Sequence, residues 1–278
     1  MSTSQPRVLL LGFGAIGRQL ATLFGSDEFD VSAFVREASV HRERGTFGVS
    51  VHDENLSSLI DSHDIVVECA GVPAVKEFGA EVVARGKDLV LTSVGALADP
   101  VARRALLSGP GKVHVISGAI GGFDLWAAVA EANAVDTVKI RTTKDAPALV
   151  QDWMNDKERA QLDTATEPFI LFSGSPTDAI QKFPSNVNVS VALAWATRGR
   201  GASDDELLQK SLERVSVELI AAPNLKETRH DIEVSGSAGS FTLGSQSAPS
   251  PVNPKTSAIT ALSVAHTLRQ ALQQCFEG

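Results

Sequence analysis

A glycine-rich segment near the N-terminus has residue types and spacing that indicate chemistry. The run Gly-Phe-Gly-Ala-Ile-Gly occupies residues 12–17 and directly follows the apolar segment 8–11. In a strand–turn–helix, such glycines permit a tight turn, close approach of a pyrophosphate and close packing of helix on strand. The helix N-terminus adds free N–H groups and positive partial charge. An ordinary glycine-rich turn is the alternative. The predicted dinucleotide contacts are Gly12, Gly14, Ala15, Ile16 and Gly17.

The residues after the second expected strand bear on the choice of cofactor. An acidic residue about 20 positions past the glycines binds the ribose of NAD, whereas an arginine accommodates the extra phosphate of NADP. Here Arg36 and Glu37 stand side by side, so the sequence leaves NAD or NADP open. Because Arg36 comes first, we predict that it contacts the cofactor and that NADP is accepted. A solvated Arg–Glu pair is the alternative.

The elements that must position these residues alternate between strand-like and helix-like patterns over the first 120 residues. Short apolar runs without alternation are typical of strands buried on both faces of a parallel sheet. Repeated β-α-β crossovers predict an α/β fold with a doubly wound parallel (Rossmann) sheet. We predict strands at 8–11, 31–35, 65–67, 89–91 and 113–116, with helices after the first and third strands and at 99–108.

The pattern changes after residue 120, where strands and helices no longer alternate regularly. This predicts a second, α+β substrate domain at 119–253, after a dinucleotide-binding domain at 1–118. The expected strands are 137–143, 169–172, 215–220, 230–234 and 240–243, and the expected helices are 176–182, 187–196 and 204–213. A final helix at 255–276, within a segment 254–278, should return to the first domain. There it should bury Ile259, Leu262, Ala265 and Leu268.

Composition excludes several classes of protein. The net charge of −8 argues against nucleic-acid and anionic-membrane partners, which select for clustered lysine and arginine. Two cysteines are too few for a disulfide framework, and no cluster has metal-ligand spacing, so we expect no metal. Neither a signal peptide nor a membrane span is expected. These features favour a cytoplasmic enzyme, and together with the glycine-rich segment they favour a nicotinamide-dependent oxidoreductase.

Several motifs later in the chain resemble those of the L-aspartate dehydrogenases. The resemblance extends over nearly the whole chain, and the motifs keep the family's order. They are Thr-Ser-Val-Gly-Ala-Leu at 92–97, Ser-Gly-Ala-Ile-Gly-Gly-Phe-Asp at 117–124, Phe-Pro-Ser-Asn-Val-Asn-Val at 183–189, His-Asp-Ile-Glu at 230–233 and Asn-Pro-Lys-Thr-Ser-Ala at 253–258. Two stretches depart from the family, a longer segment at 197–213 and residues 142–147. Either could change the preferred substrate.

The resemblance implies reversible oxidative deamination of L-aspartate, through iminoaspartate, to oxaloacetate and ammonia. It also implies a homodimer, a catalytic residue at His230 and cofactor contacts at Ala119 and Asn188. A histidine suits proton transfer because free imidazole titrates near pH 6.5. In a strand, His230 shares a face with residues 232 and 234, whereas Asp231 faces away and should not orient it. A buried structural histidine is the alternative.

Other polar residues have candidate roles near such a site. Asn186 is expected to cap the next helix, and Asn188 to hydrogen-bond the nicotinamide carboxamide. Lys144 is a candidate for binding substrate carboxylates, with a solvated lysine as the alternative. Cys69 is better explained as a small packed residue than as part of the site.

Three functions therefore stay open at this point. The first is aspartate dehydrogenase. The second is a related reductase of another imine, semialdehyde or keto acid. The third is a non-catalytic redox sensor that binds dinucleotide.

Overall fold

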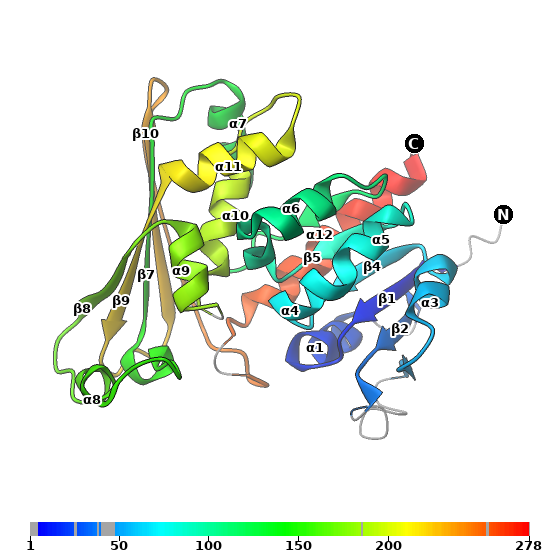
Figure 1. Ribbon diagram of the computed structural model, residues 1–278, viewed down its shortest axis with the longest axis horizontal. Coiled ribbons are helices and arrows are strands. Elements are labelled where there is room, and N and C mark those ends of the chain that lie inside the picture. Colours follow the sequence, from blue (N-terminus) through cyan, green and yellow to red (C-terminus); the bar gives the residue numbers. More distant parts are fainter. Residues whose placement is uncertain are drawn as a thin grey trace. The chain divides into compact units, whose positions relative to one another are not determined.

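The computed structural model describes residues 5–24, 27–37, 39, 48–184, 186–253 and 256–277. The chain separates into two compact units (Figure 1). Unit 1 comprises Met1–Gly118 together with Thr260–Gly278, and unit 2 comprises Ala119–Ile259. Among the described residues, no helix combines the length and the apolar character needed to cross a membrane.

Unit 1 contains a six-stranded parallel sheet with the order β3-β2-β1-β4-β5-β6. The central strands are almost entirely buried because helices cover both faces, which explains their unbroken apolar sequences. The strand order reverses between β1 and β4, and ligands of open α/β sheets bind at the carboxyl ends of strands at such a point. The strands are β1 (Arg7–Leu11), β2 (Asp30–Phe34), β3 (Ser50–His52), β4 (Ile65–Glu68), β5 (Asp88–Leu91) and β6 (Val113–Val115).

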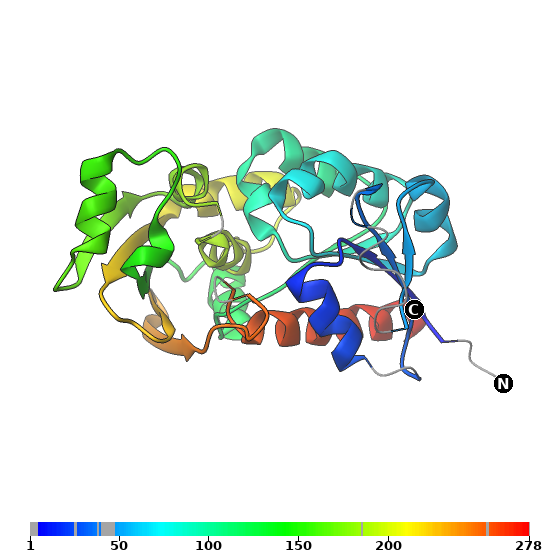
Figure 2. The ribbon, with the colours of Figure 1, turned by 90° about the horizontal axis from the view of Figure 1, so that it is seen from below.

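Helices lie on both sides of this sheet. Figure 2 shows α1 (Ala15–Leu23) and α12 (Ile259–Glu277) on one side, and α5 (Ala80–Ala84) and α6 (Pro100–Leu107) on the other. Asp99 caps α6 by accepting from two backbone N–H groups of its first turn. The remaining elements are α3 (Leu56–Ser62), α4 (Val72–Ala74), a π-helical turn at Val75–Gly79 and a 3₁₀ turn at Val94–Ala98. The doubly wound fold predicted from the sequence is confirmed.

The last helix differs from its predicted form at its start. It begins at Ile259 rather than at 255, because Ser257 pairs with Pro249 in an isolated bridge and its hydroxyl accepts from Ser247. Pro254 and Lys255, on which part of the prediction rested, lie outside the described residues. Two of the four apolar positions are buried as expected, but Ile259 and Leu262 are 43% and 49% exposed. The prediction that all four are buried is therefore wrong.

Unit 2 contains a five-stranded sheet with the order β11-β10-β7-β9-β8. The β7–β9 pair is parallel and the other pairs are antiparallel, so this unit has the predicted α+β character. The strands are β7 (Thr137–Asp145), β8 (Phe169–Gly174), β9 (Val215–Ala222), β10 (Thr228–Gly236) and β11 (Gly239–Ser247). The helices are α7 (Phe123–Glu131), α8 (Asp156–Asp163), α9 (Pro176–Lys182), α10 (Asn188–Ala196) and α11 (Asp204–Arg214), with a 3₁₀ turn at Ala146–Leu149.

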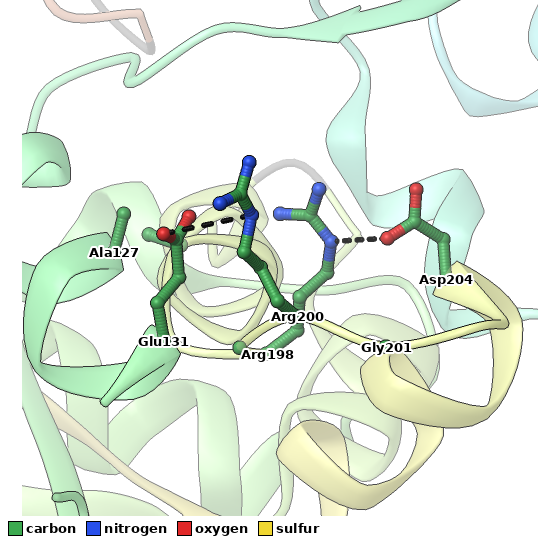
Figure 3. Close-up of a pocket in the computed structure, with 8 residues that line it drawn as sticks. Ala127, Glu131, Arg198, Arg200, Gly201 and Asp204 are labelled. Carbon is green, nitrogen blue, oxygen red and sulfur yellow. Dashed lines mark hydrogen bonds and ion pairs between the residues drawn. The ribbon is translucent and has the colours of Figure 1, made fainter. Parts of the chain in front are cut away.

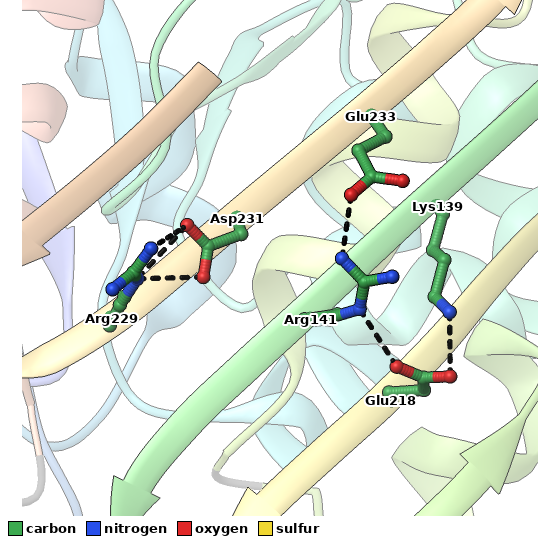
Figure 4. A network of polar contacts seen from close by, with 6 residues as sticks. All are labelled: Lys139, Arg141, Glu218, Arg229, Asp231 and Glu233. Atoms are coloured by element: carbon green, nitrogen blue, oxygen red, sulfur yellow. Dashed lines mark hydrogen bonds and ion pairs between the residues drawn. The ribbon is translucent and has the colours of Figure 1, made fainter. Parts of the chain in front are cut away.

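The two faces of this second sheet have opposite characters. One face carries the buried residues Val138, Ile140, Ile232 and Val234 and is covered by α9 and α10 (Figure 1). The other carries a network of charged side chains drawn in Figure 4, in which Glu218 accepts from both Lys139 and Arg141. Strand alternation therefore separates an apolar interior face from a polar outer face, as predicted for β10.

Among the strands and α-helices of the described residues, four were missing from the predicted set. They are β3, α3, α7 and α8. The edge strand β3 has only three residues, too few to show a pattern. By contrast, α8 has a detectable signal: Asn155 and Glu158 form a capping box at its N-terminus.

Candidate functional site

The glycine-rich segment forms the turn between β1 and α1. Gly12 has φ +98°, and a Cβ there would lie 2.7 Å from the Cβ of Ala70, so no larger residue fits. A Cβ on Gly17 would lie 2.9 Å from the Gly12 carbonyl oxygen, which makes this the point of close helix–strand packing. Gly14 is the N-cap of α1, and no described atom lies within 4 Å of where its Cβ would be. Two glycines thus serve packing, and the third leaves open space at a helix N-terminus.

Ala15 and Ile16 are the first two residues of α1. The N–H groups of a helix's first turn have no partners within the helix and point out of its N-terminus. This arrangement suits a pyrophosphate, because the backbone donors and the helix dipole both favour negative charge. The geometry therefore fits a dinucleotide in the predicted place.

The carboxyl end of β4 lies beside this turn. The Cys69 thiol donates to the Gly12 carbonyl oxygen at 3.0 Å, and its backbone N–H donates to that of Leu11 at 2.9 Å. Burial raises the pKa of Cys69, so the thiol stays protonated and acts as a packed donor. The preceding residue, Glu68, is fully buried and accepts four hydrogen bonds. Burial raises the pKa of Glu68, while those hydrogen bonds act in the opposite direction.

Arg36 follows β2 by two residues and is exposed. Its carbonyl oxygen accepts from the Ser39 backbone N–H at 2.7 Å, and the neighbouring Val35 is tied to His52 of β3. Residues 40–47 lie outside the described part of the chain. The place of Arg36 after β2 agrees with a role in cofactor choice, and this role stays a prediction.

His230 lies on the interior face of the second sheet and is 3% exposed. It pairs with Thr142 on β7, and its Nδ1 is 3.0 Å from the Thr142 hydroxyl. Burial lowers the pKa of His230 to about 3, and the charge of Lys144 acts in the same direction. His230 is therefore neutral at ordinary pH. Asp231 faces the other way and binds Arg229 at 2.7 Å (Figure 4), as predicted.

Lys144 lies two residues beyond Thr142 on β7. Its Nζ donates to Asn186 Oδ1 at 3.1 Å, and burial lowers its pKa to about 8. The alternative of a freely solvated lysine is therefore wrong.

The capping role predicted for Asn186 is wrong as well. The N-cap of α10 is Val187, and it makes no side-chain cap bond. Asn188 is the first residue of α10 and is half-buried.

We call His230, Thr142, Lys144, Asn186 and Ser245 the His230 cluster. Ala119 is connected to this cluster through β11, the second strand beside β10. His230 pairs with Ser245 on β11, and the Ser245 hydroxyl donates to the Ala119 carbonyl oxygen at 3.0 Å. Thus β10 and its two neighbouring strands bring together predicted residues from distant parts of unit 2. Thr142 and Ser245 were not predicted as site residues, because only the strand register shows that they flank His230.

Unit 2 also contains a polar pocket of about 350 Å³ at the start of the longer segment 197–213 (Figure 3). Arg198 binds Asp204 at 2.9 Å and stacks on Trp195, and Arg200 lies 3.6 Å from Glu131. Each arginine is thus matched by a carboxylate, and none of the predicted site residues lines this pocket. No group of three potential metal ligands occurs within the described residues.

Two family models match successive parts of this chain. Residues 12–114 match the family model "Homoserine dehydrogenase, NAD binding domain", and residues 124–271 match "Aspartate dehydrogenase, C-terminal". An L-aspartate dehydrogenase of Ralstonia pickettii is 34% identical over 94% of this chain and 96% of its own. One of Methanospirillum hungatei is 35% identical over 95% of each chain.

Among solved structures, aspartate dehydrogenase from Thermotoga maritima shares the fold, with a TM-score of 0.70 and 24% identity over 98% of this chain and 97% of that one. The match over more than half of the chain and the identity of the curated relatives together show that this chain belongs to the aspartate dehydrogenase family.

Proposed function

We propose that this protein is an NAD(P)-dependent L-aspartate dehydrogenase, which interconverts L-aspartate with oxaloacetate and ammonia through iminoaspartate. The observation that carries the proposal is the identity of about a third, over nearly the full chain, to proteins named L-aspartate dehydrogenase. The cluster around His230 supports it, because a neutral base and a cationic side chain lie on the same face of β7 and β10.

Unit 1 is proposed to hold the cofactor. Gly14, Ala15 and Ile16 would offer backbone N–H groups to the pyrophosphate, while Gly12 and Gly17 keep the turn close to its neighbours. Arg36 would receive a 2′-phosphate. Ala119 and Asn188 of unit 2 are proposed as further contacts, as the family resemblance implies. When bound, an oxidised nicotinamide supplies the acceptor for the hydride that leaves the substrate Cα.

His230 is proposed to move the protons. In deamination, a proton must leave the substrate amine, and another must leave the water that attacks the imine carbon. A neutral imidazole accepts such a proton directly, and Thr142 fixes the ring through Nδ1, leaving Nε2 for the transfer. Bound aspartate brings two carboxylates into the site. Their negative charge raises the pKa of His230 toward the working pH and so makes it a stronger base.

Lys144 is proposed to bind a substrate carboxylate. It remains cationic below about pH 8, and Asn186 holds it by accepting one of its three N–H donors. This leaves two N–H donors of Lys144 for a substrate carboxylate. Burial strengthens this contact because water competes less for a partly enclosed charge.

The direct test follows absorbance at the NAD(P)H band. Purified protein with L-aspartate and NAD or NADP should produce reduced cofactor, and oxaloacetate with ammonium should consume it. D-aspartate and L-malate, which differ in configuration or lack the amine, serve as controls. Turnover of L-malate but not L-aspartate would make the protein a different reductase. Cofactor binding without turnover of any of these would favour a sensor.

We also propose that the protein is a homodimer in solution, on the basis of the family resemblance. Light scattering at micromolar concentration should give twice the mass of the 29.3 kDa chain. A mass equal to one chain would contradict this.

A further inference from the structure

A fully buried carboxylate lies at the switch point of the parallel sheet. Glu68 is the last residue of β4 and is 0% exposed. It pairs with Leu11, the last residue of β1, on one side and with Leu91, the last residue of β5, on the other. Ligands of open α/β sheets bind outside the carboxyl ends of strands at this point. A buried carboxyl group therefore lies at the edge of the sheet where the cofactor is proposed to bind.

The carboxylate connects two loops that leave the same edge of the sheet. Its Oε1 accepts from the backbone N–H groups of Ala70 and Gly71, both at 2.8 Å, in the loop after β4. From the loop after β5, the Ser93 hydroxyl donates to Oε1 at 2.9 Å and the Ser93 N–H donates to Oε2 at 2.8 Å. All four contacts place a donor against an oxygen, which suits an ionised carboxylate.

The loop after β4 also limits the space around the glycine turn. Ala70 approaches so closely that a Cβ on Gly12 would lie 2.7 Å from its Cβ. Cys69 donates from its thiol to the carbonyl oxygen of Gly12 in that turn, and from its backbone N–H to the carbonyl oxygen of Leu11 just before it. Therefore the loop that Glu68 fixes is packed against the predicted pyrophosphate turn.

We propose that Glu68 is a positioning residue for the cofactor: by accepting hydrogen bonds from both loops, it holds the carboxyl edge of β1, β4 and β5 in the shape that binds NAD(P). This inference rests on the proposed dinucleotide site but not on the identity of the substrate. Glu68 itself need not touch the cofactor, because it acts through the backbone of residues 70–71 and 93.

Two substitutions separate the parts of this arrangement. In Glu68→Gln the amide oxygen can replace Oε1, but its NH₂ then faces the Ser93 N–H, so a donor meets a donor. Ser93→Ala removes only the hydroxyl contact and keeps the charge. Glu77→Gln is the matched control, since Glu77 is an exposed glutamate of the same unit, in the π-helical turn.

The test is to titrate NADH and NADPH into each protein without substrate and to monitor binding by cofactor fluorescence. The melting temperature and the steady-state kinetics of each protein are measured as well. We expect the Kd of reduced cofactor to rise at least tenfold in Glu68→Gln and about threefold in Ser93→Ala. Glu77→Gln should stay within twofold of wild type. The KM for cofactor should rise accordingly, with kcat and the KM for aspartate nearly unchanged.

A purely structural role would lower the melting temperature and leave the Kd of the folded protein unchanged. A Kd within twofold of wild type for a folded Glu68→Gln would overturn the inference. If that variant does not fold, an unchanged Kd in Ser93→Ala would overturn it instead. Because binding is measured without substrate, a wild-type protein that binds cofactor but does not oxidise aspartate would refute the proposed function alone.

Discussion

The glycine turn of unit 1 and the His230 cluster of unit 2 are built in different ways. The turn is one continuous stretch of six residues whose proposed donors are backbone N–H groups. The cluster consists of side chains from β7, β10 and β11 and the side chain of Asn186 two residues before α10, and Ser245 joins it to the Ala119 carbonyl oxygen, 126 positions away in sequence. A backbone site needs particular conformations, whereas a side-chain site needs particular strand registers. We therefore expect substitutions in the two regions to affect different steps.

The largest effect should come from His230→Ala. Loss of one acid–base group lowers kcat by roughly 10²–10⁴-fold, and the variant should keep its melting temperature if the role is catalytic. Asp231→Asn, the next residue on the opposite strand face, is the control and should retain turnover. Parallel loss of stability and rate would indicate a structural histidine, and retained turnover would remove the assignment.

The next effect concerns the choice between the two cofactors. If Arg36 receives the 2′-phosphate, Arg36→Ala removes a charge-assisted contact of about 1.5–3 kcal/mol, or roughly ten- to a hundredfold in affinity. The loss should appear in KM for NADP and not for NAD, while Arg104→Ala, an exposed arginine on α6, should change neither. Equal losses for both cofactors would mean that Arg36 is only a solvated neighbour.

Lys144→Met should raise the KM for aspartate about tenfold at neutral pH, the lower end of the range for one charged contact. Since the free-enzyme pKa of Lys144 is lowered to about 8, the wild-type kcat/KM should fall as pH rises through that value and the ammonium is lost. The variant should show no such step. Lys139→Met, on the outer face of the same strand, is the control; a step that persists in Lys144→Met would assign the titration elsewhere.

The smallest effect should come from Thr142→Val, which keeps the shape and removes the hydroxyl beside His230 Nδ1. One neutral hydrogen bond is worth about 0.5–1.5 kcal/mol, so kcat should fall roughly two- to tenfold. Thr143→Val changes the adjacent residue on the other face and should leave kcat unchanged. If both variants behave alike, Thr142 does not orient the imidazole.

The same comparison explains how much could be predicted from the sequence. The parallel sheet and the glycine turn were predictable because apolar runs and glycine spacing are local signals. Alternation along residues 230–234 also correctly separated His230 from Asp231. The hydrogen bond from Lys144 to Asn186 was not predictable, because it joins residues 42 positions apart. Glu68 gave no signal either, because a glutamate in an apolar run shows neither its burial nor the two loops that converge on it.

A comparison of four proteins tests whether cofactor binding and proton transfer depend on separate residues. NADPH is titrated into the wild type, Arg36→Ala, His230→Ala and the double variant, and kcat is measured on the same samples. Effects on distant, independent sites add within about 0.3–0.5 kcal/mol. We predict that Arg36→Ala weakens NADPH binding by the same factor in both backgrounds, and that His230→Ala changes the Kd less than twofold while abolishing most turnover. A His230→Ala variant whose Kd for NADPH rises tenfold or more would show that the two regions are not independent.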